Sequence, residues 1–302
     1  AIKKGITSLK VNIVKIKKHS QQFLKEVHDK ELINLIRRSE KELQNHKPFY
    51  PDVYPKTGYK NLPQELSLKA GFFAIDSFTP LTGNVYKAAS QAMNQALTGV
   101  DLILGGSKLA YAACRPPGHH AERKLYGGFC YFNNASIAAH ALSKHGKVAF
   151  LDIDYHHGNG SQDIFYERND VYFISIHGHP SQAYPFYSGF DDEIGLGKGK
   201  GFNKNFPLYP GAQNKKYILT LKKALEIFVK FKPKYLVVST GLDIMKGDPT
   251  GTFLIDNEGM KQIGIEIASL NLPTLLVQEG GYSLSNLKSG IKNFLVGMST
   301  QR

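Results

Sequence analysis

The chain has 302 residues, 42% of them hydrophobic, which is enough to bury a large core in a single α/β domain. Its formal net charge is +13, it has no apolar run of about 18 residues, and lysines interrupt its N-terminus, so we expect neither a membrane-spanning helix nor a signal peptide. Two cysteines, Cys114 and Cys130, are too few for a disulfide framework and fit a reducing, cytoplasmic compartment.

The first fifty residues carry much of the positive charge. They hold twelve Lys or Arg and five Asp or Glu, a net charge of +7. Such a segment can attract a polyanion such as nucleic acid, or it can form a solvated basic surface helix. The second interpretation is the more common one for a charge-rich segment.

Short apolar runs alternate with segments of helical spacing. The predicted strands are LAYAAC (109–114), KVAFLDID (147–154), VYFISIH (171–177), KYLVVST (234–240) and PTLLVQE (273–279). The predicted helices are 133–145, 214–231 and 257–270, with Asn133 and Asn257 as N-caps. Continuous apolar strands are typical of parallel sheets covered on both faces. We therefore predict one domain over residues 1–302, a three-layer α/β/α architecture with a central, mainly parallel sheet.

Two long connections have little periodicity. Residues 46–83 are rich in Pro, Gly and Tyr, and residues 178–213 contain GLGKGKG. Loops of this length are commonly lids or binding loops. The Gly–Lys alternation is not a dinucleotide-binding fingerprint, because no helix follows it directly.

A polar cluster follows each predicted strand. The five clusters are RPPGHHA, DIDYHHGNG, IHGHP, STGLDIMKGDP and QEGGY. The carboxyl ends of parallel strands lie at one edge of a sheet, and ligands bind outside that edge. We therefore predict that the active site lies there.

Asp154 and His156 are the first candidates for a metal site. At a strand end, residues i and i+2 point to the same side, so this carboxylate and imidazole converge. Asp243, after another apolar strand, is the natural third ligand, since a catalytic site usually has three protein ligands and an open position. The set fits a divalent ion such as Zn²⁺ or Fe²⁺. An isolated Asp-x-His is otherwise an ordinary polar strand end.

His119 and His120 are adjacent, so their side chains diverge and do not readily bind a single metal. They can flank a reacting water as base and acid if a carboxylate or amide fixes the tautomer of each imidazole. Asp152 and Asn159 are the candidates for these partners. The alternative interpretation is a turn with two surface histidines.

Tyr282 follows a glycine pair that allows the backbone to bring a phenol into the site. A phenol can donate a hydrogen bond to an oxyanion as charge develops on a carbonyl. A packed loop tyrosine is the alternative, because the chain has sixteen tyrosines. No serine lies in a nucleophile elbow, so metal-assisted attack by water on an acyl carbon is favoured over an acyl-enzyme.

Six motifs, in order and with matching spacing, resemble those of the arginase-like zinc deacetylases, the family that includes the histone deacetylases. The motifs are RPPGHHA, GGFCYFNNASIAA, LDIDYHHGNGSQDIFY, ISIHG, STGLDIMKGDPTG and QEGGY. The resemblance extends from about Phe72 to Met298. It implies the arginase/deacetylase fold and hydrolysis of an acetamide by a zinc-activated water, with acetate and a free amine as products.

The resemblance also implies the roles of individual residues. It implies zinc ligation by Asp154, His156 and Asp243, and a carbonyl-polarising role for Tyr282. It pairs His119 with Asp152, and it pairs His120, as general base and acid, with Asn159. A structural potassium ion is implied at Asp152, Ser175 and the backbone carbonyls of Asp154, His156 and Ile176. The substrate tunnel is implied to have Phe129 and Tyr184 as walls, Gly128 beside the acyl-amine stem and Asp76 near the rim.

Within the family, residues 175–208 and 54–86 resemble the acetylpolyamine amidohydrolase branch, and the first part of 54–86 resembles its inserted loop. In that branch the inserted loop builds a dimer with a narrow mouth, so the resemblance implies a homodimer that deacetylates small acylated amines. The first strand usual in the family is not in this sequence. The charge of +13 repels cationic polyamines at long range, and the acidic FDDEIG segment can offset this locally.

Two other functions remain open from the sequence. One is a protein lysine deacetylase acting on histone-like substrates, which predicts an open tunnel and a monomer. The other is a binding protein that reads acyl-lysine or a polyanion, which the basic N-terminal segment favours and the full set of catalytic residue types opposes. We expect a small acylated amine or acetyl-lysine as substrate, and neither a membrane nor nucleic acid as partner.

Overall fold

In the computed structural model, which describes residues 1–43, 47–51, 53–55 and 61–300, the strands form a six-stranded sheet in the order β1-β6-β5-β2-β3-β4. Every strand pairs parallel to its neighbours. The strands are β1 Leu109–Ala112, β2 Val148–Asp152, β3 Val171–Gly178, β4 Asn203–Leu208, β5 Tyr235–Thr240 and β6 Thr274–Gln278. This confirms the predicted parallel sheet of an α/β/α protein.

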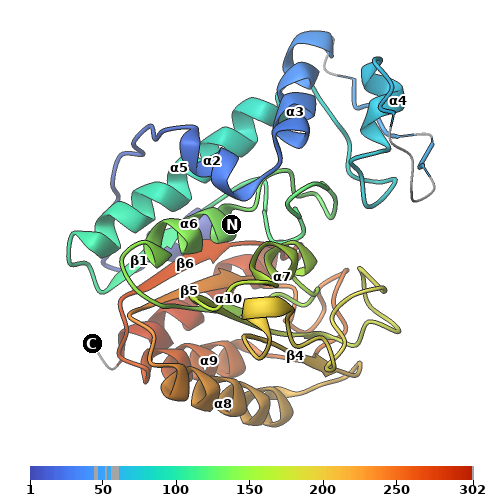
Figure 1. Cartoon of the computed structure of the whole chain (residues 1–302). Coiled ribbons are helices and arrows are strands. Elements are labelled where there is room, and N and C mark those ends of the chain that lie inside the picture. Colours follow the sequence, from blue (N-terminus) through green and yellow to red (C-terminus); the bar gives the residue numbers. More distant parts are fainter. Residues whose placement is uncertain (44–46, 52, 56–60, 301–302) are drawn as a thin grey trace.

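Helices cover both faces of the sheet (Figure 1). The helices are α1 Ile2–Ile6, α2 Gln22–Val27, α3 Lys30–Glu42, α4 Leu66–Ala70, α5 Val85–Leu104, α6 Asn134–Ser143, α7 Asn159–Phe165, α8 Asn214–Phe231, α9 Asn257–Ala268 and α10 Leu284–Ser299. One apolar core lies between the sheet and α2, α3, α5 and α6. The second lies between the opposite face and α8, α9 and α10.

Alternation along β2 explains the two cores. Val148 and Phe150 belong to the first core, whereas Ala149 and Leu151 belong to the second. All four side chains are fully buried. Because successive side chains of a strand point to opposite faces, a continuous apolar run is what a strand between two helical layers requires.

Most predicted elements are present with shorter bounds. Asn133 caps α6, since its side chain accepts a hydrogen bond from Ser136 N. The prediction of Asn257 as an N-cap is wrong by one residue: Asp256 caps α9 by accepting from Gly259 N. A carboxylate there satisfies an otherwise unpaired N–H and interacts favourably with the helix dipole, so the cap lies one position earlier.

Strand β4 and helices α5 and α10 were not predicted. Strand β4 lies in the connection 178–213, where its burial alternates along the edge strand. Polar Asn203 and Asn205 occupy buried positions in it, so its sequence lacks an apolar run. The connection 46–83 contains α4. Its residues 46, 52 and 56–60 lie outside the described part of the chain.

The basic N-terminal segment is only partly helical. Residues 9–20 run without regular structure beside α5, where Lys17 N donates to Thr98 Oγ1 over 3.0 Å and His19 N to Asn94 Oδ1 over 2.8 Å. Helix α3 buries one face, including Leu32, and exposes its basic one. No helix in the described residues is long and apolar enough to cross a bilayer.

Candidate active site

The candidate residues converge at the carboxyl edge of the sheet. Strand β2 lies between β3 and β5, and it ends at Asp152, opposite Ser175 and Ser239. The segments after β2, β5 and β6 therefore leave the sheet side by side. Their polar side chains meet there, as the strand-end clusters predicted.

Asp154, His156 and Asp243 form a compact set of metal-binding groups. One donor atom from each lies within 4.8 Å of the others. His156 Nδ1 is 3.3 Å from Asp154 Oδ1 and 3.1 Å from Asp243 Oδ2. Both carboxylates are completely buried. Three such donors around one point suit a divalent cation with a remaining open position.

The second oxygen of each carboxylate is held by the backbone. Gly280 N donates to Asp154 Oδ2 over 2.8 Å, and Tyr155 N donates to Asp243 Oδ1 over 2.9 Å. A Cβ atom on Gly280 would lie 2.6 Å from Asp243 Oδ2. Glycine is therefore required here so that the two carboxylates can approach each other.

The electrostatics of this set fit a bound cation. Burial, followed by the charge of Asp154, raises the pKa of Asp243 to about 7. Burial opposes the charge of His156, but hydrogen bonds to Asp154 and Asp243 outweigh it and raise the pKa of that imidazole to about 9. Two buried carboxylates thus face the imidazole of His156 at close range, and a divalent ion at this place would compensate their charge.

His119 is paired with a carboxylate. Its Nδ1 lies 3.0 Å from Asp152 Oδ2, and its Nε2 lies 3.7 Å from Asp154 Oδ1. Burial opposes its protonation, but the charges of Asp154 and Asp152 raise the pKa of His119 to about 10.

Glu279 holds the turn that carries His119, and the sequence reasoning did not identify it. Gly118 N and His119 N both donate to Glu279 Oε2, over 2.6 and 3.1 Å, while Ser239 Oγ donates to Oε1. In the sequence, Glu279 directly follows β6 within the motif QEGGY, in which only the glycines and Tyr282 were given a role.

His120 is paired with an amide. Its Nδ1 lies 2.8 Å from Asn159 Oδ1. Burial, and then the charges of His119 and His156, hold the pKa of His120 well below its usual value. The ring packs edge-on to Tyr184 at 4.8 Å, and a side chain on Gly128 would collide with it. The two adjacent histidines therefore have opposite preferences for a proton.

Tyr282 follows β6 at the same edge of the sheet, and it is 40% exposed. Asp248 fixes its backbone, because Asp248 Oδ2 accepts from Tyr282 N over 2.7 Å and from Ser283 N over 3.0 Å. Burial, and then the charges of Asp243 and Asp154, raise the pKa of Tyr282, so the phenol keeps its proton and remains a donor. Asp248 belongs to the motif STGLDIMKGDPTG, and the sequence alone indicated no role for it.

Aromatic side chains form the walls of the opening. Phe129, which has φ of +65° and is 40% exposed, lies 6.2 Å from Tyr282 and 5.5 Å from Phe78 by ring centroids. Phe78 also contacts Tyr184 at 5.7 Å. Phe78 lies in the connection 46–83, whose lack of periodicity concealed it.

Four hydrogen-bond donors engage Asp76, which the family resemblance implies near the tunnel rim. It is buried, its Oδ1 accepts from Phe78 N and Thr79 N, and its Oδ2 accepts from Gly128 N and Tyr184 OH. Its carboxylate thus ties two tunnel walls together, and any contact with substrate stays a prediction.

The residues expected to hold potassium also lie together. Asp152 and Ser175 are register partners in β2 and β3, and Ile176 follows in β3. Ser175 Oγ lies 2.7 Å from His177 Nδ1, and Asp152 Oδ1 accepts from Asp154 N over 3.0 Å. Potassium binding stays a prediction.

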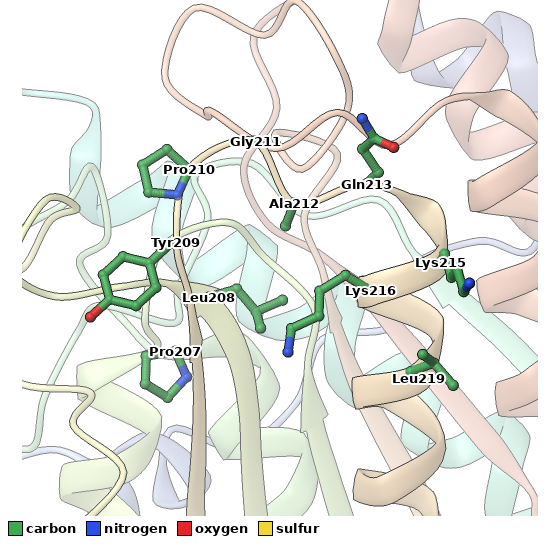
Figure 2. A pocket seen from close by; sticks show the side chains of 10 residues that line it. All are labelled: Pro207, Leu208, Tyr209, Pro210, Gly211, Ala212, Gln213, Lys215, Lys216 and Leu219. Atoms are coloured by element: carbon green, nitrogen blue, oxygen red, sulfur yellow. The ribbon is translucent and has the colours of Figure 1, made fainter.

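A separate hollow of about 680 Å³ lies between the end of β4 and the start of α8 (Figure 2). Its lining includes Tyr209, Lys215, Lys216 and Leu219, and it contains none of the candidate catalytic residues. We therefore place the candidate chemistry at the carboxylate–imidazole cluster, because the lining of the hollow has no carboxylate, imidazole or thiol that could hold a metal ion.

Comparison with known proteins shows the family of the chain. A sequence profile of the histone deacetylase domain matches residues 2–298. Acetylpolyamine amidohydrolase 2 of Pseudomonas aeruginosa is 40% identical over 237 residues, which are 78% of this chain and 69% of that protein. The acetylpolyamine amidohydrolase of Burkholderia pseudomallei is 42% identical over 228 residues, covering 75% of this chain and 67% of that protein. The crystal structure of acetylpolyamine aminohydrolase from Burkholderia pseudomallei superposes with a TM-score of 0.94 and 33% identity, over 99% of this chain and 88% of that chain.

Proposed function

Because this chain belongs to the histone deacetylase domain family, in its acetylpolyamine amidohydrolase branch, we propose that it is a zinc-dependent amidohydrolase that removes acetyl groups from small acylated amines. The observation that carries the proposal is the cluster of Asp154, His156 and Asp243, in which both carboxylates are buried. Beside it lie two histidines whose Nδ1 atoms face a carboxylate and an amide oxygen. Water adds to the acyl carbon, the C–N bond breaks, and acetate and a protonated amine leave.

Asp154, His156 and Asp243 would hold the ion. Zinc in that position would supply a Lewis acid that activates water and polarises the acyl oxygen. The same three donors suit Fe²⁺, so metal analysis of the purified protein must distinguish Zn²⁺ from Fe²⁺.

His120 is the proposed general base and acid. Its Nδ1 faces an amide oxygen, so Nδ1 carries the proton and the lone pair of Nε2 is free. Its low pKa keeps it neutral before the reaction, which a base requires. It takes a proton from the attacking water and returns it to the leaving nitrogen. His119 is held by Asp152, and its Nε2 lies 3.7 Å from Asp154 Oδ1, beside the reacting centre.

Tyr282 is the proposed donor to the acyl oxygen. Its phenol remains protonated, and its backbone is fixed by Asp248 rather than by the sheet. A hydrogen bond that strengthens as the carbonyl oxygen gains charge lowers the barrier more than it aids substrate binding.

The narrow aromatic opening favours slender substrates such as acetylpolyamines. Phe129, Phe78 and Tyr184 contact one another around it, and Gly128 would lie beside the acyl-amine stem, as the family resemblance implies. Asp191 and Asp192, a few positions after Tyr184 in the sequence, are exposed. The next residue, Glu193, is turned inward and accepts a hydrogen bond from Gly189 N. We propose that these two exposed carboxylates attract an ammonium group locally against the global charge of +13.

Further parts of the proposal concern assembly. We propose one deacetylase domain over residues 1–302, with 46–83 as an inserted loop that forms part of a homodimer and of the substrate mouth. Potassium at Asp152, Ser175 and Ile176 would be structural. Cys114 and Cys130 are buried free thiols, which accords with a cytoplasmic location. Mass measurement in solution tests the dimer.

Comparative kinetics test the substrate class. We expect kcat/KM for acetylputrescine and acetylspermidine to exceed that for an acetyl-lysine peptide with the zinc-loaded protein. The reverse order, together with a monomer, would favour the alternative function as a protein lysine deacetylase. Metal-loaded protein without amidase activity on any acylated amine would favour the binding-protein alternative.

A further inference from the structure

Glu122 lies two residues after His120 and has no role in the chemistry described so far. Its Oε1 accepts a hydrogen bond from Asn159 Nδ2 over 2.8 Å, and Asn159 Oδ1 in turn lies 2.8 Å from His120 Nδ1. The three side chains form a continuous hydrogen-bonded chain that ends on the proposed general base.

The middle member, Asn159, ends in an amide, so the orientation of that amide decides which of its atoms faces His120. The carboxylate of Asp152 has only acceptor atoms, so it fixes His119 Nδ1 as a donor in either orientation. Asn159 has an acceptor at one end and donors at the other. If its amide group turned by 180°, an NH₂ group would face His120 Nδ1, and the imidazole proton would move to Nε2. With Nε2 protonated, neutral His120 cannot accept a proton from water.

Glu122 disfavours that flip. An ionised carboxylate only accepts hydrogen bonds, so the NH₂ end of Asn159 must face it, and the oxygen must face His120. A flipped amide would place its oxygen against the carboxylate and leave two acceptors in contact. The carbonyl of His120, 3.4 Å from Asn159 Nδ2, favours the same orientation more weakly.

The backbone around Glu122 is held firmly enough for this task. Glu122 N donates to Leu125 O over 2.9 Å, and His28 Nδ1 donates to Glu122 O over 2.9 Å. The charged Asp163 lies near the side chain of Glu122, and its Oδ2 accepts a hydrogen bond from Arg123 N over 2.8 Å. Burial raises the pKa of Glu122 to about 7, the hydrogen bond from Asn159 opposes the rise, and the charge of Asp163 adds to it.

We propose that Glu122 is a positioning residue that locks the Asn159 amide and thereby keeps His120 in the tautomer with a free Nε2 lone pair. The inference rests on the proposed role of His120 as the base. It extends the pair His120–Asn159 to a triad that includes a carboxylate.

The first test replaces Glu122 by methionine, which keeps the volume and removes both acceptors. We expect kcat on acetylputrescine to fall about tenfold with KM nearly unchanged, since only the fraction of enzyme with the correct tautomer reacts. Exposed Glu167, just after α7, provides the matched control, and E167M should keep the wild-type rate. Measurements at about pH 8 keep Glu122 largely ionised.

The second readout is the tautomer itself. In ¹⁵N-histidine-labelled protein, imidazole ¹⁵N spectra distinguish a protonated Nδ1 from a protonated Nε2, and the variant H120A identifies the signals of His120. Wild type should show Nδ1 protonated, and E122M a substantial population with Nε2 protonated. An unchanged tautomer in E122M overturns the inference, whether or not the rate falls, and so does a wild-type rate.

A compensating pair keeps the test valid if E122M does not fold. In E122Q the introduced amide and that of Asn159 can pair in two arrangements, so we expect mixed tautomers. In E122Q/N159D the introduced amide donates to the introduced carboxylate, so only acceptor atoms face His120, and the Nδ1-protonated form should return together with most of the rate. A single, equal tautomer in both variants contradicts the lock. If wild type lacks amidase activity, the proposed function fails, and the tautomer spectra still decide the role of Glu122.

Discussion

The backbone N–H of Gly280 donates a hydrogen bond to Asp154 Oδ2 over 2.8 Å, and this joins the end of β6 to a carboxylate that follows β2. The same glycine leaves the space in which the Asp154 and Asp243 carboxylates face each other, because a Cβ atom there would lie 2.8 and 2.6 Å from their Oδ2 atoms. The candidate metal site thus depends on the absence of a side chain as much as on its three ligands.

Gly280→Ala should therefore weaken metal binding strongly. The added methyl group must push at least one buried carboxylate away, and we expect zinc affinity to fall at least tenfold, as measured by competition with a chelator. Gly247→Ala is the control, because a Cβ there meets nothing within 4 Å although its φ is +83°. The control should lose about 1 kcal/mol of stability through backbone strain and keep its zinc affinity. Equal zinc affinities for Gly280→Ala and Gly247→Ala would contradict the explanation that the two carboxylates need the space beside a glycine.

Removing the hydroxyl of Tyr282 should lower turnover while leaving the metal bound. We expect Tyr282→Phe to reduce kcat by about a hundredfold or more, the usual effect of losing an oxyanion donor. Metal content measured on the same sample separates loss of a donor from loss of the ion. Tyr209→Phe, in the separate hollow, should be neutral. Full activity of zinc-loaded Tyr282→Phe would sink the proposed mechanism.

Metal removal should affect both activity and stability. Without a divalent ion, the buried carboxylates of Asp154 and Asp243 are compensated by neighbouring imidazoles alone, and the folded state loses the free energy of metal binding. We expect dipicolinate to abolish activity and lower the melting temperature, and added Zn²⁺ or Fe²⁺ to restore both. In Asp243→Asn the melting temperature should respond weakly to either treatment. A wild-type melting curve unaffected by chelator and metal would speak against the site.

His28 should make the protein more sensitive to mild acid. It is completely buried, its Nδ1 donates to Glu122 O and its Nε2 accepts from Asn133 N over 2.8 Å, so it is neutral in the folded state. Burial lowers its pKa from 6.5 to about 4. The unfolded chain therefore binds the extra proton between these values, and stability present above about pH 6.5 is lost as the pH falls toward 4.

His28→Gln provides the measurement. The variant loses hydrogen bonds and should be less stable than wild type at pH 7.5, but this difference in unfolding free energy should shrink by about 2 kcal/mol at pH 5. Urea unfolding at the two pH values gives the difference, in which the titration of other histidines cancels. A constant difference would show that His28 is not held neutral.

The candidate metal ligands followed from local rules. Asp154 and His156 are two positions apart at the end of an apolar run, and Asp243 follows a second such run, so parallel strand ends were sufficient to predict their approach. Similarly, the continuous apolar strands predicted a sheet buried on both faces, which β2 confirms. These inferences needed only periodicity within one element and the common direction of the strands.

The tertiary structure alone decided how the candidate catalytic side chains are held. Glu279 accepts from His119 N across 160 positions, Asn133 N donates to His28 across 105, and Asp76, expected near the rim, is turned inward by four donors. No local pattern encodes such partners, because they are selected by the requirement that every buried polar group find a donor or acceptor wherever the fold brings one. The sequence determined which chemical groups reach the carboxyl edge, and packing determined which atom of each group faces the candidate site.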